Sequence, residues 1–440
     1  MSLPRIGTLM PLPVLPQIST FGSLDPHTLL LELPTTSREG LEASLAGRDD
    51  GAVARIYAHE LRHFDDLVGT VWGQDYLDLL FRAYDATLDG RSAELAYPEL
   101  LRLFDADRSI LFPRYYKYVM GAAPAGSVND RWRMSYTTGA RIRPDGFADE
   151  SDPILFVRFD KGRVHVARQP LSVGSLLELR AIGAEMGQLA CSIARLPAAE
   201  ALVEERLRSR ELLSMIYDPE LITYSVGAHV AANALGNEDL ASMLDAGFKV
   251  AGVALNLTGN SFGRMRHAEG FGNEMGWQRK RAFGMRRDRG YAFASLLFHM
   301  RGLVHDMVDK RVLAATLERA GLRSINEIYT AARRHVEAKS GSGLVNARLR
   351  ATRERLVEVG LSKLRPPDHD QMALTARASA TFAPLIMTGV ELAEFHVGEP
   401  ALDASETMFL VDCNFQVRTE TRQALRAGRG LDFEASDYVY

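Results

Sequence analysis

The sequence has little cysteine, with only Cys191 and Cys413 among 440 residues. The two cysteines could pair, but Cys191 stands in an apolar helical run, which more simply predicts a small buried residue. The apolar stretch from Met10 to Leu15 is interrupted by prolines and is too short for a signal peptide. We therefore expect the protein to work in a reducing, cytoplasmic compartment.

Long hydrophobic runs and an excess of one charge are also missing. No apolar run reaches the roughly 18 residues that a transmembrane helix requires. The net charge of −4 gives no reason to expect nucleic acid or a membrane as a partner. Contents of 46% hydrophobic and 25% charged residues are typical of a soluble globular protein. A chain of 440 residues can form two domains or one large, elaborated domain.

The most informative stretch is the pattern His-Glu-x-x-His, formed by His59, Glu60 and His63. Residues four apart on a helix lie one turn above each other, so the two imidazoles can face the same point. Two imidazoles at this spacing are half of a tetrahedral zinc site. Glu60 projects beside them, where a carboxylate could take the proton of a metal-bound water. The alternative is a solvated helix face with two histidines and an ion-paired glutamate.

A second pattern, Glu-x-x-Ala, is formed by Glu178 and Ala181 in another expected helix, from Val173 to about Arg195. Together the two patterns resemble the zincin metallopeptidases and, within them, the gluzincin group. The resemblance covers roughly residues 50–70 and 173–195. It implies a zinc-dependent peptidase whose metal ligands come from both helices. The ligands that it implies are His59, His63 and Glu178.

Three carboxylates compete for the third ligand position. Asp66 shares the helix of the histidines, and one straight helix cannot easily wrap three ligands round an ion, so Asp66 is not expected to bind the metal directly. It could orient an imidazole, or it could cap or solvate the helix. Glu185 lies two turns after Glu178, about 10 Å along the axis, so only one of them can reach the metal. The small Ala181 lets a neighbouring helix approach Glu178 closely, whereas Gln188 fills the equivalent place for Glu185. We therefore predict Glu178.

If the site binds zinc, its residues would have different roles in catalysis. A zinc ion with three protein ligands keeps its fourth position for water and lowers the pKa of that water toward ~7. Glu60 would accept the proton as the water attacks a carbonyl group, and would then pass it to the leaving amine. The resemblance implies that a tyrosine or a histidine stabilises the oxyanion. Tyr224 and His229, one helix after Glu178, are the candidates, and each could instead be an ordinary core or surface aromatic.

Elsewhere the apolar residues mostly follow helical spacing. A β-hairpin is predicted at 154–168, and the short apolar run 27–33 predicts one strand. We expect an α+β fold that is mainly α-helical, with a zincin-like metal-site core, a small β-sheet or hairpin and large helical elaborations. The catalytic region would span 1–339 with an insertion at 70–150, and a C-terminal helical and β region would span 340–440.

The segment 258–289 differs from its surroundings because it is rich in glycine and arginine. This composition predicts a long loop. The loop could be solvated surface, a flexible flap over the site, or an anchor for an acidic group of the substrate.

Three function classes remain open at this point. The first, which we favour, is a zinc-dependent metallopeptidase or amide hydrolase that acts on a peptide or protein. The second is an iron(II)-dependent, peptide-modifying oxygenase, because two histidines and one carboxylate also suit iron(II). The third is a non-catalytic helical interaction protein.

Overall fold

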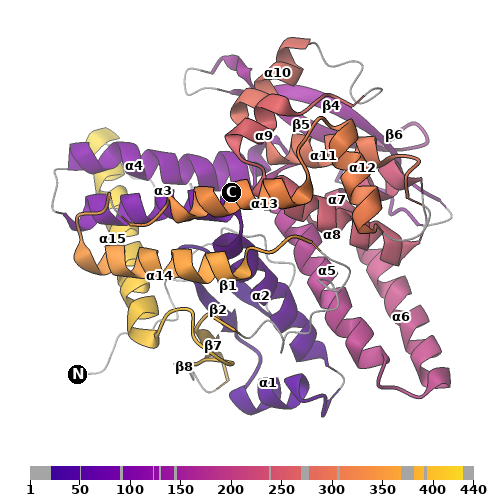
Figure 1. Ribbon diagram of the computed structural model, residues 1–440, viewed down its shortest axis with the longest axis horizontal. Helices are drawn as coiled ribbons and strands as arrows, with labels where there is room; N and C mark the ends of the chain where they lie inside the picture. The colour runs from indigo at the N-terminus through magenta and orange to yellow at the C-terminus, as the bar shows by residue number, and fades with distance from the viewer. Residues whose placement is uncertain are drawn as a thin grey trace.

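The structure is a computed structural model and is mainly α-helical, as the sequence predicted, with two small β-sheets in its described part (Figure 1). It describes residues 21–49, 51–89, 93–121, 123–127, 130–142, 146–236, 239–268, 277–304, 308–341, 343–367, 381–390 and 394–429. Within these ranges, no helix combines the length and the apolar character needed to span a membrane.

Helices make up most of the described chain. The α-helices are α1 (Arg38–Leu45), α2 (Ala52–Gly69), α3 (Val71–Leu88), α4 (Ala93–Asp105), α5 (Val173–Ile193), α6 (Ala198–Ile216), α7 (Ile222–Leu235), α8 (Leu240–Asn256), α9 (Gly259–Arg264), α10 (Trp277–Arg286), α11 (Arg289–Met300), α12 (Lys310–Arg319), α13 (Ile325–Glu337), α14 (Ala347–Lys363) and α15 (Ala404–Arg429). Shorter helical segments are the π-helix η2 (Ala106–Leu111) and the 3-10 helices η3 (Arg114–Tyr116) and η4 (Pro219–Leu221).

The centre of the molecule is the packing of α2 along α5, with α7 and α8 against the other sides of α5 (Figure 1). Helix α2 is amphipathic, and the residues of its apolar stripe, such as Leu61 and Phe64, are buried. Helix α5 is apolar on most sides, so nearly all of its first half is buried. The chain turns sharply from α2 into α3 at Thr70, whose hydroxyl accepts a hydrogen bond from the Gly73 amide. A Cβ at Gly73 would lie 2.0 Å from the Leu67 carbonyl oxygen, so this turn requires glycine.

The two sheets have four strands each within the described residues. One contains β1 (Ser23–Asp25), β2 (Leu30–Leu33), β7 (Ile386–Thr388) and β8 (Glu394–Phe395), in the order β1-β2-β7-β8. The other contains β3 (Tyr118–Val119), β4 (Arg133–Ile142), β5 (Ala148–Lys161) and β6 (Val164–Pro170), in the order β3-β6-β5-β4. Antiparallel β5 and β6 confirm the hairpin predicted at 154–168, and β2 lies within the predicted strand 27–33.

The C-terminal region 340–440 is joined to the rest of the described fold rather than set apart from it. Strand β7 pairs in parallel with β2, with Leu31 opposite Ile386. Helix α14 packs against α2, and α15 packs against α3. The described parts of the regions 1–339 and 340–440 therefore share a sheet and a core.

The glycine- and arginine-rich segment 258–289 is not a loop throughout, because it contains α9 and α10. Helix α10 packs on β5, where the Arg279 guanidinium contacts the Glu150 carboxylate at 2.8 Å and donates to the Thr138 hydroxyl at 2.7 Å. These long-range contacts stabilise a helix that the local composition does not suggest. Residues 269–276 of the segment lie outside the described residues.

Candidate metal centre

Three side chains from α2 and α5 converge in the interior. The Nε2 atom of His59 lies 3.5 Å from Glu178 Oε2, and the Nε2 atom of His63 lies 3.7 Å from Glu178 Oε1. The two imidazole rings are 4.9 Å apart and nearly perpendicular. One ligand atom from each of the three residues lies within 4.8 Å of the others. The helical spacing of the histidines and the crossing of α2 with α5 produce this arrangement together.

The chemistry of this cluster fits a metal ion. The Glu178 side chain is 1% exposed, and neither of its oxygens has a hydrogen-bond partner in the described structure. A buried carboxylate without a donor is costly, and coordination of a cation would remove that cost. Nitrogen and carboxylate ligands of this kind suit zinc or iron(II).

The charges of the cluster are strongly coupled. Burial raises the pKa of Glu178, with partial compensation from His59. Burial lowers the pKa of His63 well below the usual value, and the positive charges of His59 and Arg62 act in the same direction. Burial also lowers the pKa of His59, but the carboxylates of Glu178 and Glu185 outweigh this effect and raise it well above normal.

Glu60 is adjacent to the cluster and is covered by the edge strand β1. Its side chain is buried, and the Leu24 amide donates a hydrogen bond to its carboxylate. A Cβ at Gly22, the residue before β1, would lie 2.7 Å from the Ile56 side chain and 3.2 Å from that of Glu60, so the chain enters the strand close to α2. Burial raises the pKa of Glu60 to about 7, although His59 and the Leu24 amide lower it.

Glu185 lies on the other side of His59. Its Oε2 atom is 3.6 Å from His59 Nδ1, while Glu178 faces Nε2 of the same ring. Two carboxylates of α5 therefore flank one imidazole from opposite sides. A carboxylate at Nδ1 favours a proton on that nitrogen and leaves the Nε2 lone pair for a metal. The sequence pattern indicated Glu185 only as a rival ligand and gave no sign of this contact.

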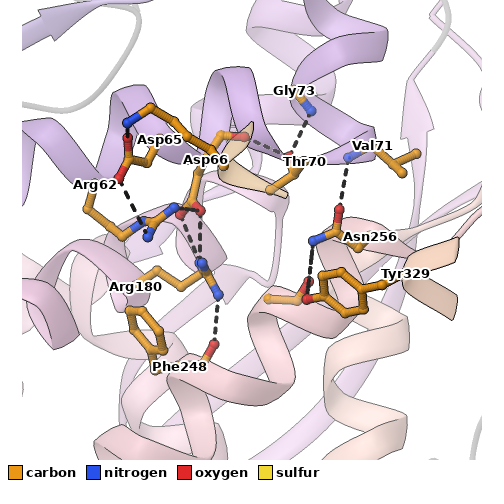
Figure 2. Close-up of polar contacts among 12 residues, drawn as sticks. Arg62, Asp65, Asp66, Thr70, Val71, Gly73, Arg180, Phe248, Asn256 and Tyr329 are labelled. Atoms are coloured by element: carbon orange, nitrogen blue, oxygen red, sulfur yellow. Dashed lines mark hydrogen bonds and ion pairs between the residues drawn. The ribbon is translucent and has the colours of Figure 1, made fainter. Parts of the chain in front are cut away.

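Asp66 does not orient an imidazole, which was one of the roles open to it from the sequence; it forms an ion pair instead. Its carboxylate accepts hydrogen bonds from Arg180 Nε at 3.0 and 2.9 Å and from Arg62 Nη2 at 2.7 Å. Arg180 also donates through Nη1 to the Phe248 carbonyl at 3.0 Å (Figure 2). Asp66 follows His63 by three residues and Arg180 follows Glu178 by two, so the ion pair joins α2 and α5 just beyond the cluster.

The same end of α2 is held by further polar contacts. Lys363 of α14 donates to the Asp65 carboxylate. Asn256 of α8 accepts a hydrogen bond from the Val71 amide at 3.1 Å, at the start of α3 (Figure 2). These contacts come from α14 and α8, and the ion pair of Asp66 with Arg180 adds α5, so the position of the candidate ligands depends on several helices of the bundle. Only the proximity of Asp66 to the motif signalled this network in the sequence.

The two predicted oxyanion donors are placed differently. Tyr224 of α7 is buried, and its hydroxyl has no hydrogen-bond partner in the described structure. Burial raises its pKa, and the nearby charges of Glu178 and Glu60 raise it further.

His229 is not brought to the metal cluster. Its ring packs among Trp132, Phe159 and Tyr217, and its Nε2 atom is 2.9 Å from the Ile216 carbonyl. Burial lowers the pKa of His229 to about 4, so the ring stays neutral at physiological pH. His229 follows Tyr224 by five residues, and this spacing turns the two side chains to different faces of α7.

Comparisons with known proteins give no further guide. No protein-family model, curated protein or solved structure matches the chain.

Proposed function

We propose that the protein is a zinc-dependent hydrolase, specifically a metallopeptidase with a zincin-like core, and that its substrates are peptides or proteins. The observation that carries this proposal is the convergence of His59, His63 and Glu178, with Glu60 buried beside them. The three converging residues would hold the zinc ion. Glu60 would remain free for proton transfer, because the neighbouring residues already supply three ligands.

The side chains divide the chemistry among them. When bound, the zinc ion would supply Lewis acidity and lower the pKa of a water molecule. Glu60 would accept the proton of the attacking water on its carboxylate, which the Leu24 amide holds in place, and then deliver it to the leaving amine nitrogen. Tyr224 would donate a hydrogen bond to the substrate carbonyl oxygen as that oxygen gains negative charge. Its unpartnered hydroxyl is available for this role.

An iron(II)-dependent, peptide-modifying oxygenase is the competing function, since the same three ligands suit iron(II). The buried Glu60 favours hydrolysis, because a general base next to the ligands is a requirement of hydrolysis. Metal analysis of protein purified without added metal separates the two. Bound zinc supports the hydrolase, bound iron supports the oxygenase, and no bound metal contradicts both.

The substitution Glu60→Gln tests the mechanism. We expect the variant to keep its metal and to lose roughly 100-fold or more of its turnover on a peptide library, because the amide cannot accept a proton. The matched control is Glu39→Gln at an exposed position of α1, which should leave both properties unchanged. Near-complete activity of Glu60→Gln would show that the proposed proton transfer is wrong.

A further inference from the structure

Helix α6 is attached to the rest of the described fold along a small part of its surface. It lies at the periphery, beside α5 and α7 (Figure 1). Of its 19 residues only Leu212 and Ile216 are buried, and both belong to its last two turns. Most surface helices of this length bury a continuous apolar stripe against a core. The first half of α6 therefore has an outer face without an intramolecular role in the described structure.

That outer face carries an ordered set of side chains, which we call the α6 stripe. It consists of Glu200, Val203, Leu207 and Arg210, whose spacings of three, four and three residues place them along one side of the helix. Val203 is 67% exposed and Leu207 is 47% exposed. Adjacent exposed apolar residues flanked by charges are typical of a helix that pairs with another helix.

The charges at the two ends of the α6 stripe are available for an intermolecular contact. Elsewhere on α6, Arg208 is hydrogen-bonded to Glu204 at 2.7 Å and to Glu211 at 2.8 Å. Glu200 and Arg210 form no ion pair with any part of the chain that the structure describes. The stripe thus has a free negative charge at one end and a free positive charge at the other.

We propose that the protein forms a dimer in which α6 packs antiparallel against α6 of a second copy. A two-fold axis midway between Val203 and Leu207 places Val203 of one copy opposite Leu207 of the other, and Leu207 opposite Val203. The same axis places Glu200 opposite Arg210 of the second copy, at both ends of the contact. The stripe is therefore complementary to itself in shape and in charge, as a two-fold interface requires.

The size of this contact sets its strength. One helix pair buries less surface than the roughly 1,200 Å² at the lower end of stable interfaces, so the dimer should dissociate in about the micromolar range. The proposal does not depend on the metal or on catalysis, because the stripe contains none of the residues assigned to the metal centre.

Sedimentation velocity of the full-length protein from about 1 to about 200 µM tests the proposal. We expect a concentration-dependent shift from monomer to dimer, and loss of the dimer in Val203→Asp. Leu202→Asp is the matched control, since Leu202 is 48% exposed on the same helix but lies off the stripe, and this variant should still dimerise. Far-UV circular dichroism and thermal unfolding verify that each variant folds.

Charge exchange gives the decisive result. Glu200→Arg and Arg210→Glu should each weaken the dimer about tenfold or more, because each opposes like charges at both ends. The double variant E200R/R210E should restore dimerisation to near that of the unmodified protein. A protein that stays monomeric over the whole concentration range overturns the proposal. So does a dimer that the single charge variants leave intact, or one that the double variant fails to restore.

Discussion

The buried ion pair between Asp66 and Arg180 should control both stability and metal binding. The Asp66 side chain is fully buried and the Arg180 side chain is 7% exposed. Breaking such a pair by removing one partner typically costs about 3–5 kcal/mol, because the other charge is left buried without compensation. Arg180 would keep its hydrogen bond to the Phe248 carbonyl and its position over the Phe248 ring. We therefore expect Asp66→Asn to lose about 3 kcal/mol of unfolding free energy.

The assay is urea unfolding of metal-free protein, followed by far-UV circular dichroism, with the midpoint and slope compared between variants. The control is Glu42→Gln, which breaks the ion pair between Arg38 and Glu42 on the surface of α1. Both side chains of that pair are more than half exposed, so its loss should change stability by less than about 0.5 kcal/mol. A loss below about 1 kcal/mol for Asp66→Asn would refute the reasoning.

The same variant should also bind zinc less tightly. The ion pair of Asp66 with Arg180 connects α2 to α5 and so helps to set the relative position of the two helices along their axes. That position brings Glu178 to the two imidazoles. Competition with a chromophoric chelator should show a loss of affinity of about 10- to 100-fold, in the range of other residues that support metal ligands. The Glu42→Gln control should bind zinc normally. If Asp66→Asn unfolds more easily but binds zinc normally, the ion pair is structural only.

Two further predictions concern individual side chains of the site. Glu178→Ala should lower zinc affinity by well over 100-fold because it removes a ligand, whereas Glu185→Ala should cost about 10- to 100-fold because it removes only the contact to His59 Nδ1. Equal losses in a chelator competition assay would contradict this ranking. Tyr224→Phe should lower kcat by about 100-fold with little change in KM, since it removes a donor to the oxyanion. It should not lower the thermal stability, because the buried hydroxyl has no partner to lose; a destabilised variant with normal kcat would assign Tyr224 to the core.

The sequence alone determined the features that depend on local geometry. The period of the α-helix predicts that His59 and His63 face the same point, and their rings lie 4.9 Å apart. Strand-forming residues on both sides of Asp-Lys-Gly predict the hairpin of β5 and β6. Glu178 was selected from three carboxylates by a short pattern, and the structure brings that residue to both imidazoles.

Tertiary structure decided what depends on how the helices meet. The crossing of α2 and α5 places Glu185 at the far nitrogen of His59 and pairs Asp66 with Arg180, a residue that no local pattern distinguishes. Helix α7 is apolar on most sides, so its sequence shows no inward face, and only packing separates Tyr224 from His229. The parallel pairing of β7 with β2 joins residues more than 350 positions apart. Periodicity fixes neighbours within one element, whereas contacts between elements follow from the angles and separations that the packed core imposes.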